Sequence, residues 1–222
     1  MPINHLLKAG GVIILPLLIC LVMVTVMVIE RSRFWLGVSR QQERFAKQVM
    51  ELYRHQSDLT LVKVKQHLDL PLARIFLAAL ELESPTAEEF RLALESELQA
   101  ELPILKRFSN IFDLIVGLSP LLGLIGTVIG LITSFGGLNI GDIGGTKTAT
   151  VSAGISEALI TTAAGLLVAT VALIFATTFR SLYQRQLALI QEYGGQLELI
   201  YRRHYEGSGG RAVPVRVKPS ME

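Results

Sequence analysis

One carboxylate stands alone in a long apolar part of this chain. Residues 148–179 contain a single charged side chain, that of Glu157. A charge near the centre of a bilayer costs about 2.5–3.5 kcal/mol on insertion scales, so a residue of this type is kept there for a function. Desolvation favours the neutral form of a carboxyl group and so allows it to take up and release protons. The residue type therefore indicates proton transfer at Glu157, if its side chain lies within the membrane.

The spacing along the chain leaves the depth of Glu157 open. The segment from Glu157 to Arg180 would span about 34 Å as a helix. If Arg180 marks one membrane surface, Glu157 lies either inside the membrane or at the opposite interface as a solvated residue. Thr161 comes one turn later and would share the face of Glu157, whereas Thr162 would point well away from it.

A second pattern is a row of small polar residues in the apolar block 114–141. Ser119, Gly123, Thr127 and Ser134 are separated by four, four and seven residues and would therefore share one helical face. Hydroxyl groups in such helices commonly bond to carbonyl groups of their own helix. The row therefore has two open interpretations, a polar path along the helix or ordinary local hydrogen bonding.

Small residues also predict close helix contacts. Gly126 and Gly130 form a GxxxG pair, a spacing that lets two helices approach closely within a membrane. Gly123 precedes this pair, and Gly154 and Gly165 lie in the apolar block that contains Glu157. We expect these five glycines to mediate helix packing.

Composition excludes several other functions. The net charge is only +2, which gives no global basic field for nucleic acid. The four histidines lack metal-ligand spacing, and no phosphate-binding loop is present, so no metal site, cofactor or catalytic group is expected. The single cysteine, Cys20, cannot form an internal disulfide.

Three apolar blocks are long enough for spanning helices, which need about 20 residues each. The predicted spans cover residues 10–30, 111–136 and 150–179. A cleaved signal peptide is disfavoured for the first, because its apolar part is long and the charged run Glu30–Arg33 follows it. The expected fold is an all-α integral membrane protein in which long helical extensions continue from three transmembrane helices.

Basic residues near the spans predict the orientation. They concentrate after the first span, before the second and after the third, which places these parts inside and the N-terminus outside. The predicted order is a periplasmic tail (1–9), span one (10–30), a cytoplasmic helical insert (31–110), span two (111–136), a periplasmic loop (137–149), span three (150–179), a cytoplasmic helix (180–206) and a flexible tail (207–222).

The insert carries helix signals of its own. Thr86 and Glu89 have the spacing of a capping box, and apolar residues recur every four positions from Phe90 onward. Pro103 is expected to kink this helix where it runs into the second span.

Two stretches resemble a known family, namely GLSPLLGLIGTVIGLITSF at 117–135 and GISEALITTAAGL at 154–166. They are similar to the MotA/TolQ/ExbB proton-channel family, and three spans rather than four favour its ExbB/TolQ branch. The motifs are long, and the resemblance is strong over about residues 105 to 195.

The resemblance implies a homopentamer in the bacterial inner membrane whose second and third spans line a central pore. It also implies a single-span ExbD- or TolR-like partner that brings an essential aspartate, and a TonB- or TolA-like protein that the proton flow energises. Membrane lipids surround the assembly. Three family positions carry over as ion-pathway residues, namely Thr127, Glu157 and Thr162, and the family holds this glutamate inside the pore. Thr161, which stands where many members have alanine, and Ser134 complete the predicted pathway.

Two alternatives remain. The chain could be a structural membrane scaffold with an interfacial Glu157, or it could carry sodium, since carboxylate and hydroxyl oxygens can ligate either ion.

Overall fold

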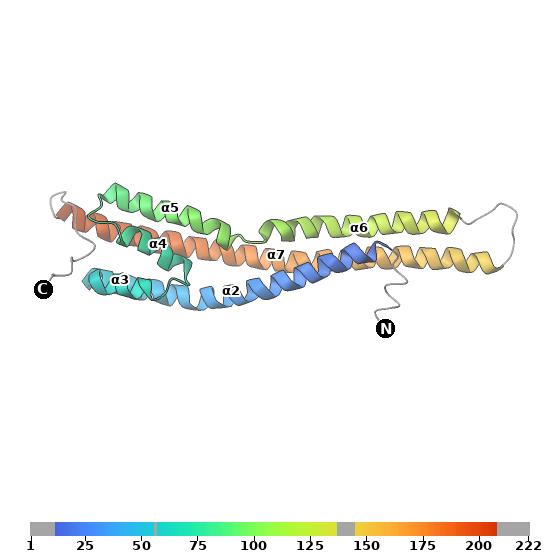
Figure 1. Cartoon of the computed structure of the whole chain (residues 1–222), viewed down its shortest axis with the longest axis horizontal. Helices are drawn as coiled ribbons and strands as arrows, with labels where there is room; N and C mark the ends of the chain where they lie inside the picture. Colours follow the sequence, from blue (N-terminus) through green and yellow to red (C-terminus); the bar gives the residue numbers. More distant parts are fainter. Residues whose placement is uncertain (1–11, 56, 137–144, 208–222) are drawn as a thin grey trace. The chain divides into compact units, whose positions relative to one another are not determined.

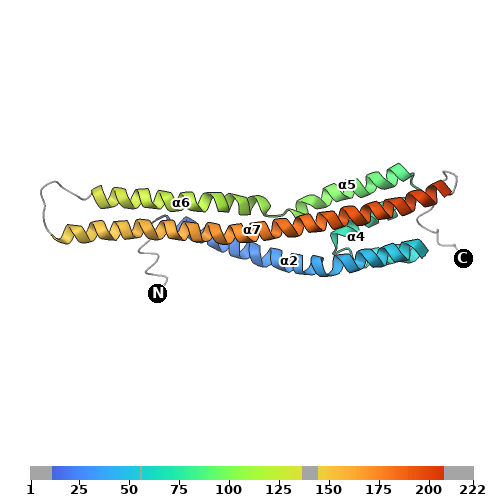
Figure 2. The same ribbon diagram turned by 180° about the vertical axis from the view of Figure 1, so that it is seen from behind.

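The computed structural model describes residues 12–55, 57–136 and 145–207, and every regular element in these ranges is an α-helix (Figures 1 and 2). The predicted tail 1–9, part of the loop 137–149 and nearly all of the tail 207–222 lie outside the described residues. The helices are α2 (Ile14–His55), α3 (Ser57–Lys65), α4 (Pro71–Leu80), α5 (Ala87–Leu105), α6 (Ser109–Gly136) and α7 (Gly145–Gly207).

Three of these helices are long and apolar enough to cross a membrane, which confirms the prediction of three spans. The spanning windows fall in α2, α6 and α7, each with a mean hydropathy of 2.3. The chain is therefore a multi-pass membrane protein.

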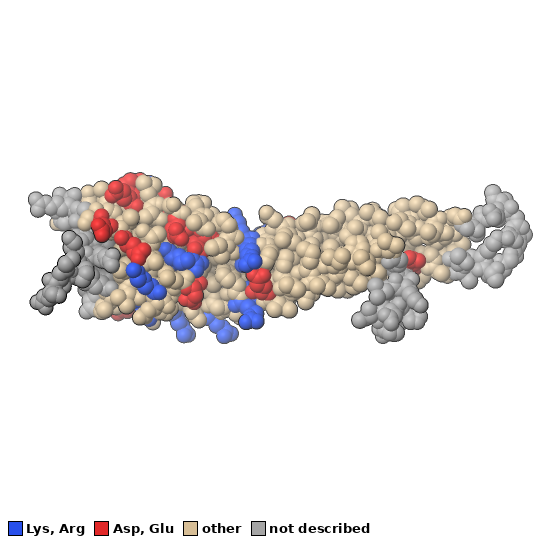
Figure 3. All heavy atoms as spheres, viewed as in Figure 1, with Lys and Arg blue, Asp and Glu red and all other residues tan. Residues whose placement is uncertain are grey.

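The chain forms two compact units. The spanning unit consists of residues Met1–Arg31 and Phe108–Phe179, and the polar unit consists of Ser32–Arg107 and Arg180–Glu222. On the face drawn in Figure 3, charged side chains of both signs are interspersed over the polar unit, while the surface of the spanning unit is almost entirely uncharged.

Within the spanning unit, α6 runs beside the first half of α7 in both ribbon views (Figures 1 and 2). One face of α6 is buried, and its central residues are small: Phe112, Ile115, Ser119, Gly123, Gly126, Gly130 and Ser134. The large apolar side chains of α6 point outward instead, with Leu121 and Ile132 more than half exposed. The phenyl rings of Phe112 and Phe179 lie 5.7 Å apart and close one end of this contact.

The core of the polar unit is built around α4. This short helix begins at Pro71, where proline's fixed φ suits a first helical turn. Its buried residues include Leu72, Ile75, Phe76 and Leu80, each at most 1% exposed. An amphipathic helix that buries most of its apolar residues this completely needs neighbours on several sides, and α3 and α5 provide two of them.

A partly buried ion pair joins α4 to α5. The Arg74 guanidinium donates through Nε and Nη2 to both carboxylate oxygens of Glu101, at 2.5 and 2.7 Å, and donates through Nη1 to the carbonyl of Leu68 at 2.6 Å. The Glu101 side chain is only 3% exposed. The hydrogen bond to Glu101 raises the pKa of Arg74. Removing either partner would leave an uncompensated buried charge or donor, so the two helices are fixed in one register.

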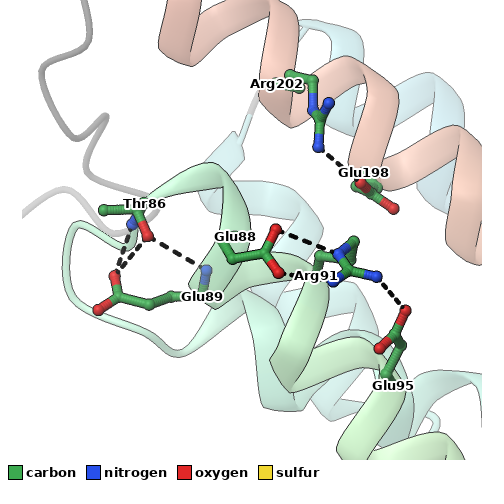
Figure 4. A network of polar contacts seen from close by, with 7 residues as sticks. All are labelled: Thr86, Glu88, Glu89, Arg91, Glu95, Glu198 and Arg202. Carbon is green, nitrogen blue, oxygen red and sulfur yellow. Dashed lines mark hydrogen bonds and ion pairs between the residues drawn. The ribbon is translucent and has the colours of Figure 1, made fainter.

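The predicted capping box at the start of α5 is confirmed. Thr86 Oγ1 accepts from the backbone N–H of Glu89 at 3.2 Å, and the Glu89 carboxylate accepts from the backbone N–H of Thr86 at 2.7 Å (Figure 4). One turn further, Arg91 bridges Glu88 and Glu95 on the exposed side of α5.

The kink expected at Pro103 stays a prediction, but the helix of the insert does not run unbroken into the second span. Pro103 stays within α5, which ends at Leu105, and α6 begins at Ser109. Phe108 between them has a φ of 66°, in the left-handed region that non-glycine residues rarely adopt. The interruption therefore lies at residues 106–108, just after Pro103, and Phe108 turns the backbone there.

The end of α7 is held in the polar unit by Tyr201. Its ring stacks on Phe90 with centroids 4.2 Å apart and planes 7° from parallel. Its hydroxyl donates to the carbonyl of Pro85 at 2.5 Å, and the residue is 1% exposed. The Tyr201 side chain therefore provides a hydrogen-bond donor for the turn before α5 and also packs against α5 itself.

We predict that Tyr201→Phe keeps the stack but leaves the buried Pro85 carbonyl unpaired. The free energy of unfolding should fall by about 1–2 kcal/mol, and Tyr201→Ala, which also removes the ring, should cost about 3–5 kcal/mol. Thermal unfolding in detergent, followed by circular dichroism, measures both. Leu199→Ala, at a side chain 58% exposed, is the control and should change little. A Tyr201→Phe variant as stable as the wild type would contradict this account.

Candidate functional site: the contact between α6 and α7

The contact between α6 and α7 depends on glycines of both helices. A Cβ atom added at Gly123 would lie 3.0 Å from the Thr162 Cα, and one at Gly126 would lie 2.7 Å from the Thr161 Cβ. One at Gly130 would lie 2.9 Å from the Ala158 Cβ. The separations at Gly126 and Gly130 are shorter than real Cβ contacts and that at Gly123 is at the short limit, so glycine is needed for this approach at the first two positions and favoured at the third.

The glycines of α7 are equally constrained. A Cβ at Gly165 would lie 2.5 Å from the carbonyl oxygen of Ser119 and 3.2 Å from the Gly123 Cα. A Cβ at Gly154 would collide with the Ser134 hydroxyl. All five glycines expected to mediate packing thus lie at the α6–α7 contact within a single chain.

Three of the predicted pathway hydroxyls bond to their own helices. Thr127 donates to the carbonyl of Leu124 at 2.6 Å, and Ser134 donates to that of Gly130 at 2.7 Å. Thr161, which is 1% exposed, donates to Ala158 at 2.8 Å. In this single chain, local hydrogen bonding therefore accounts for these three groups.

Thr162 differs because its hydroxyl crosses between helices. It donates to the carbonyl of Gly123 at 3.1 Å, which links the middle of α7 to the middle of α6. Nearby Ser119 is fully buried, and its Oγ has no hydrogen-bond partner among the described residues. The structure thus brings Thr161, Thr162 and Ser119 together with the α6 glycines.

Glu157 lies at the edge of this contact. It is half-buried, next to the buried Ala158 that faces Gly130. Among the described residues its carboxylate has no hydrogen bond or ion pair, and no group of three or more potential metal ligands forms there or elsewhere in the described ranges. The carboxylate is therefore not committed to a partner in the described part of the chain.

Further hydroxyls lie on the exposed side of α7 and were not predicted as pathway residues. Ser156, Thr170 and Thr177 are exposed and stand at multiples of seven residues, and both threonines bond to carbonyls of their own helix. A seven-residue spacing keeps residues near one face of a helix, so this row could have been found from the sequence.

Residues 67–192 match the profile of the MotA/TolQ/ExbB proton channel family. Both sequence motifs, at 117–135 and 154–166, lie inside this range, as does the whole α6–α7 contact up to Phe179. The chain belongs to the MotA/TolQ/ExbB proton channel family. Members of this proton channel family are membrane transport components and not enzymes, which agrees with the absence of a catalytic constellation in the sequence.

Two ExbB-like proteins of Synechocystis are similar to this chain over most of its length. ExbB-like 3 is 50% identical over 198 residues, which cover 89% of this chain and 94% of the relative. ExbB-like 1 is 39% identical over 198 residues, covering 87% of this chain and 76% of the relative. Both are assigned by name to biopolymer transport.

The glycine contact predicts an asymmetry between two alanine substitutions. Gly165→Ala forces its Cβ against the backbone of Ser119, which cannot move aside as a side chain could, and should cost about 1–3 kcal/mol. Gly117→Ala in α6 meets no heavy atom within 4 Å and should leave stability unchanged or slightly raised. Unfolding by sodium dodecyl sulfate in mixed micelles, read by circular dichroism, compares them. Equal tolerance of both substitutions would show that α6 and α7 do not approach this closely.

Proposed function

We propose that this chain is the larger, channel-forming subunit of a proton-driven motor of the ExbB/TolQ type. The observation that carries the proposal is the position of Glu157. It is the single charged residue of 148–179, it is half-buried, and it lies beside the contact formed by the two family motifs. A carboxyl group without an internal partner, at the edge of a packed pair of apolar helices, can exchange a proton with a group from outside the chain.

The proposed assembly is a homopentamer in the bacterial inner membrane, with the second and third spans of each copy around a central pore. An ExbD- or TolR-like subunit supplies the aspartate that takes up protons in the pore. The sequence supports the need for such a partner, because its acidic residues near the second span, Asp113 and Asp142, flank the apolar block and do not lie within it. The flow of protons energises a TonB- or TolA-like protein.

Within this proposal the predicted pathway residues take different roles. Glu157 is the electrostatic or gating group, and Thr127, Thr161, Thr162 and Ser134 are hydroxyls of the pathway. Of these, Thr162 also holds α7 to α6 through Gly123, so its substitution acts on packing as well as on conduction. The charge pattern supports an orientation with the N-terminus in the periplasm and with the large insert and the C-terminus in the cytoplasm.

Proton flux into liposomes tests the proposal directly. The chain is reconstituted with and without its genomic small-subunit neighbour, as wild type, Glu157→Gln and Glu157→Ala. We expect flux only with the partner, and a loss of about tenfold or more in both variants, because neither side chain exchanges a proton near neutral pH. Glu206→Gln, at an exposed position in the polar unit, is the matched control and should retain flux.

The possible outcomes separate the proposal from its rivals. Flux that survives Glu157→Gln would place this residue outside the ion path. Absence of flux in every combination, with normal insertion and assembly, would favour a structural scaffold. Thr162→Ser keeps the donor to Gly123 and should retain flux, whereas Thr162→Val removes that donor and should reduce flux together with stability.

Ion identity has its own test. Replacing external sodium with potassium at a fixed proton gradient should leave the partner-dependent flux unchanged, because the proposed carriers of charge are carboxyl-bound protons. A flux that falls when external sodium is replaced would identify a sodium-driven member of the family.

A further inference from the structure

The polar unit contains an open cavity of about 570 Å³, and none of the predicted ion-pathway residues lines it. Five of its lining residues come from α2, and the sixth comes from the connection between α3 and α4. The lining residues are Arg40, Gln41, Arg44, Phe45, Gln48 and His67. No carboxylate is among them, and all six belong to the described part of the chain.

The two arginines carry uncompensated charge. Arg40 and Arg44 stand one helical turn apart, and within the described ranges neither side chain forms an ion pair or a hydrogen bond. The acidic residue between them, Glu43, is already bound to Lys47 at 2.8 Å. Like charges at this spacing destabilise a helix, so an anion bound across both guanidinium groups would relieve the repulsion.

The rest of the cavity suits a polar ligand with an organic part. Phe45 is 3% exposed and forms the floor, with its ring centroid 5.3 Å from that of His67. His67 Nδ1 lies 3.1 Å from the Lys63 carbonyl; when it donates there, Nε2 is left for another partner. Gln41 and Gln48 add amide donors. The two arginines and two glutamines are exposed, so the cavity is open to solvent and has room for a small anion.

We propose that this cavity binds a phosphate-bearing anion. Arginine is suited to this task because its planar guanidinium offers paired donors that match two phosphate oxygens. The two guanidinium groups on one helix face can neutralise a dianion, and the two amides add hydrogen-bond donors. No acidic residue in the lining competes for them.

A neighbouring cavity shows the difference. It measures about 460 Å³ and also contains two basic residues, Lys47 and Arg54, but Glu51 lines it as well. Lys47 is in addition paired with Glu43. This cavity therefore has no uncompensated pair of charges, and its two basic residues supply a control of equal charge on the same helix.

The phosphate group could belong to a lipid or to a soluble molecule. Glu30 is the first charged residue after the apolar part of α2, and Arg40 lies ten residues beyond it, about 15 Å along the helix axis. The interfacial region of each leaflet is only about 5–8 Å thick. This length favours a soluble phosphate, and the experiment includes a lipid arm.

The purified full-length chain in neutral detergent and low salt is titrated with inorganic pyrophosphate, and calorimetry and the melting temperature are recorded. Low salt is needed because exposed charges are screened at higher ionic strength. We expect binding that raises the melting temperature, as any ligand specific for the folded state must. Arg40→Gln/Arg44→Gln should weaken binding by about tenfold or more, and Lys47→Gln/Arg54→Gln by less than about twofold.

Arg40→Lys/Arg44→Lys keeps the charge but removes the planar donors, and should lie between wild type and the glutamine variant; this keeps the test decisive if the glutamine variant folds poorly. The lipid arm compares nanodiscs of phosphatidylcholine with and without phosphatidylglycerol. Arginine-dependent stabilisation by phosphatidylglycerol alone would support the phosphate site and assign it to a lipid. Binding lost equally in the Lys47/Arg54 control, or no binding in either arm, would overturn the proposal.

Discussion

The spanning unit rests on the close approach of two helix backbones, α6 and α7. At Gly165 this approach leaves no room for even one methyl group, because the carbonyl of Ser119 occupies the space. In a bilayer, burying apolar area gives little driving force between helices, so contact distance and interhelical hydrogen bonds matter more. The Thr162 hydroxyl uses this closeness to reach Gly123, and Glu157 is left at the edge of the contact because small residues fill its centre.

The polar unit is stabilised by different means. Here water supplies a hydrophobic driving force, so α4 buries large residues such as Phe76 and Leu72. Two of its polar side chains reach partners far away in the sequence. Arg74 binds Glu101 from another helix, and Tyr201 reaches Pro85 across 116 residues of sequence. The spanning unit thus packs through small residues and the polar unit through large apolar ones. Helices α2 and α7 contribute to both units.

Much of this architecture could be predicted because its signals are local. Hydropathy located three spans, and the Thr86–Glu89 spacing located the start of α5. Side-chain directions were harder. Steps of four residues rotate by about 40° each around a helix, so the row drawn through Ser119 and Gly123 leaves the buried face at Thr127. The buried face instead mixes steps of three and four, passes through Gly126 and Gly130, and meets the predicted row again at Ser134. The Arg74–Glu101 pair lay beyond prediction, since spacing rules describe neighbours on one helix and not partners on two. The roles of the pathway residues stay predictions, because a single chain does not contain the partner that would face Glu157.

The outward display of large side chains on α6 has a practical consequence. Leu121 and Ile132 are exposed in the single chain while glycines face inward, so most of the apolar mass of this helix must be covered by acyl chains or by neighbouring copies. A detergent with a short or loosely packed tail covers these side chains but packs against them less closely. Purification conditions should therefore influence the integrity of the spanning unit more than that of the polar unit, whose core is made of its own side chains.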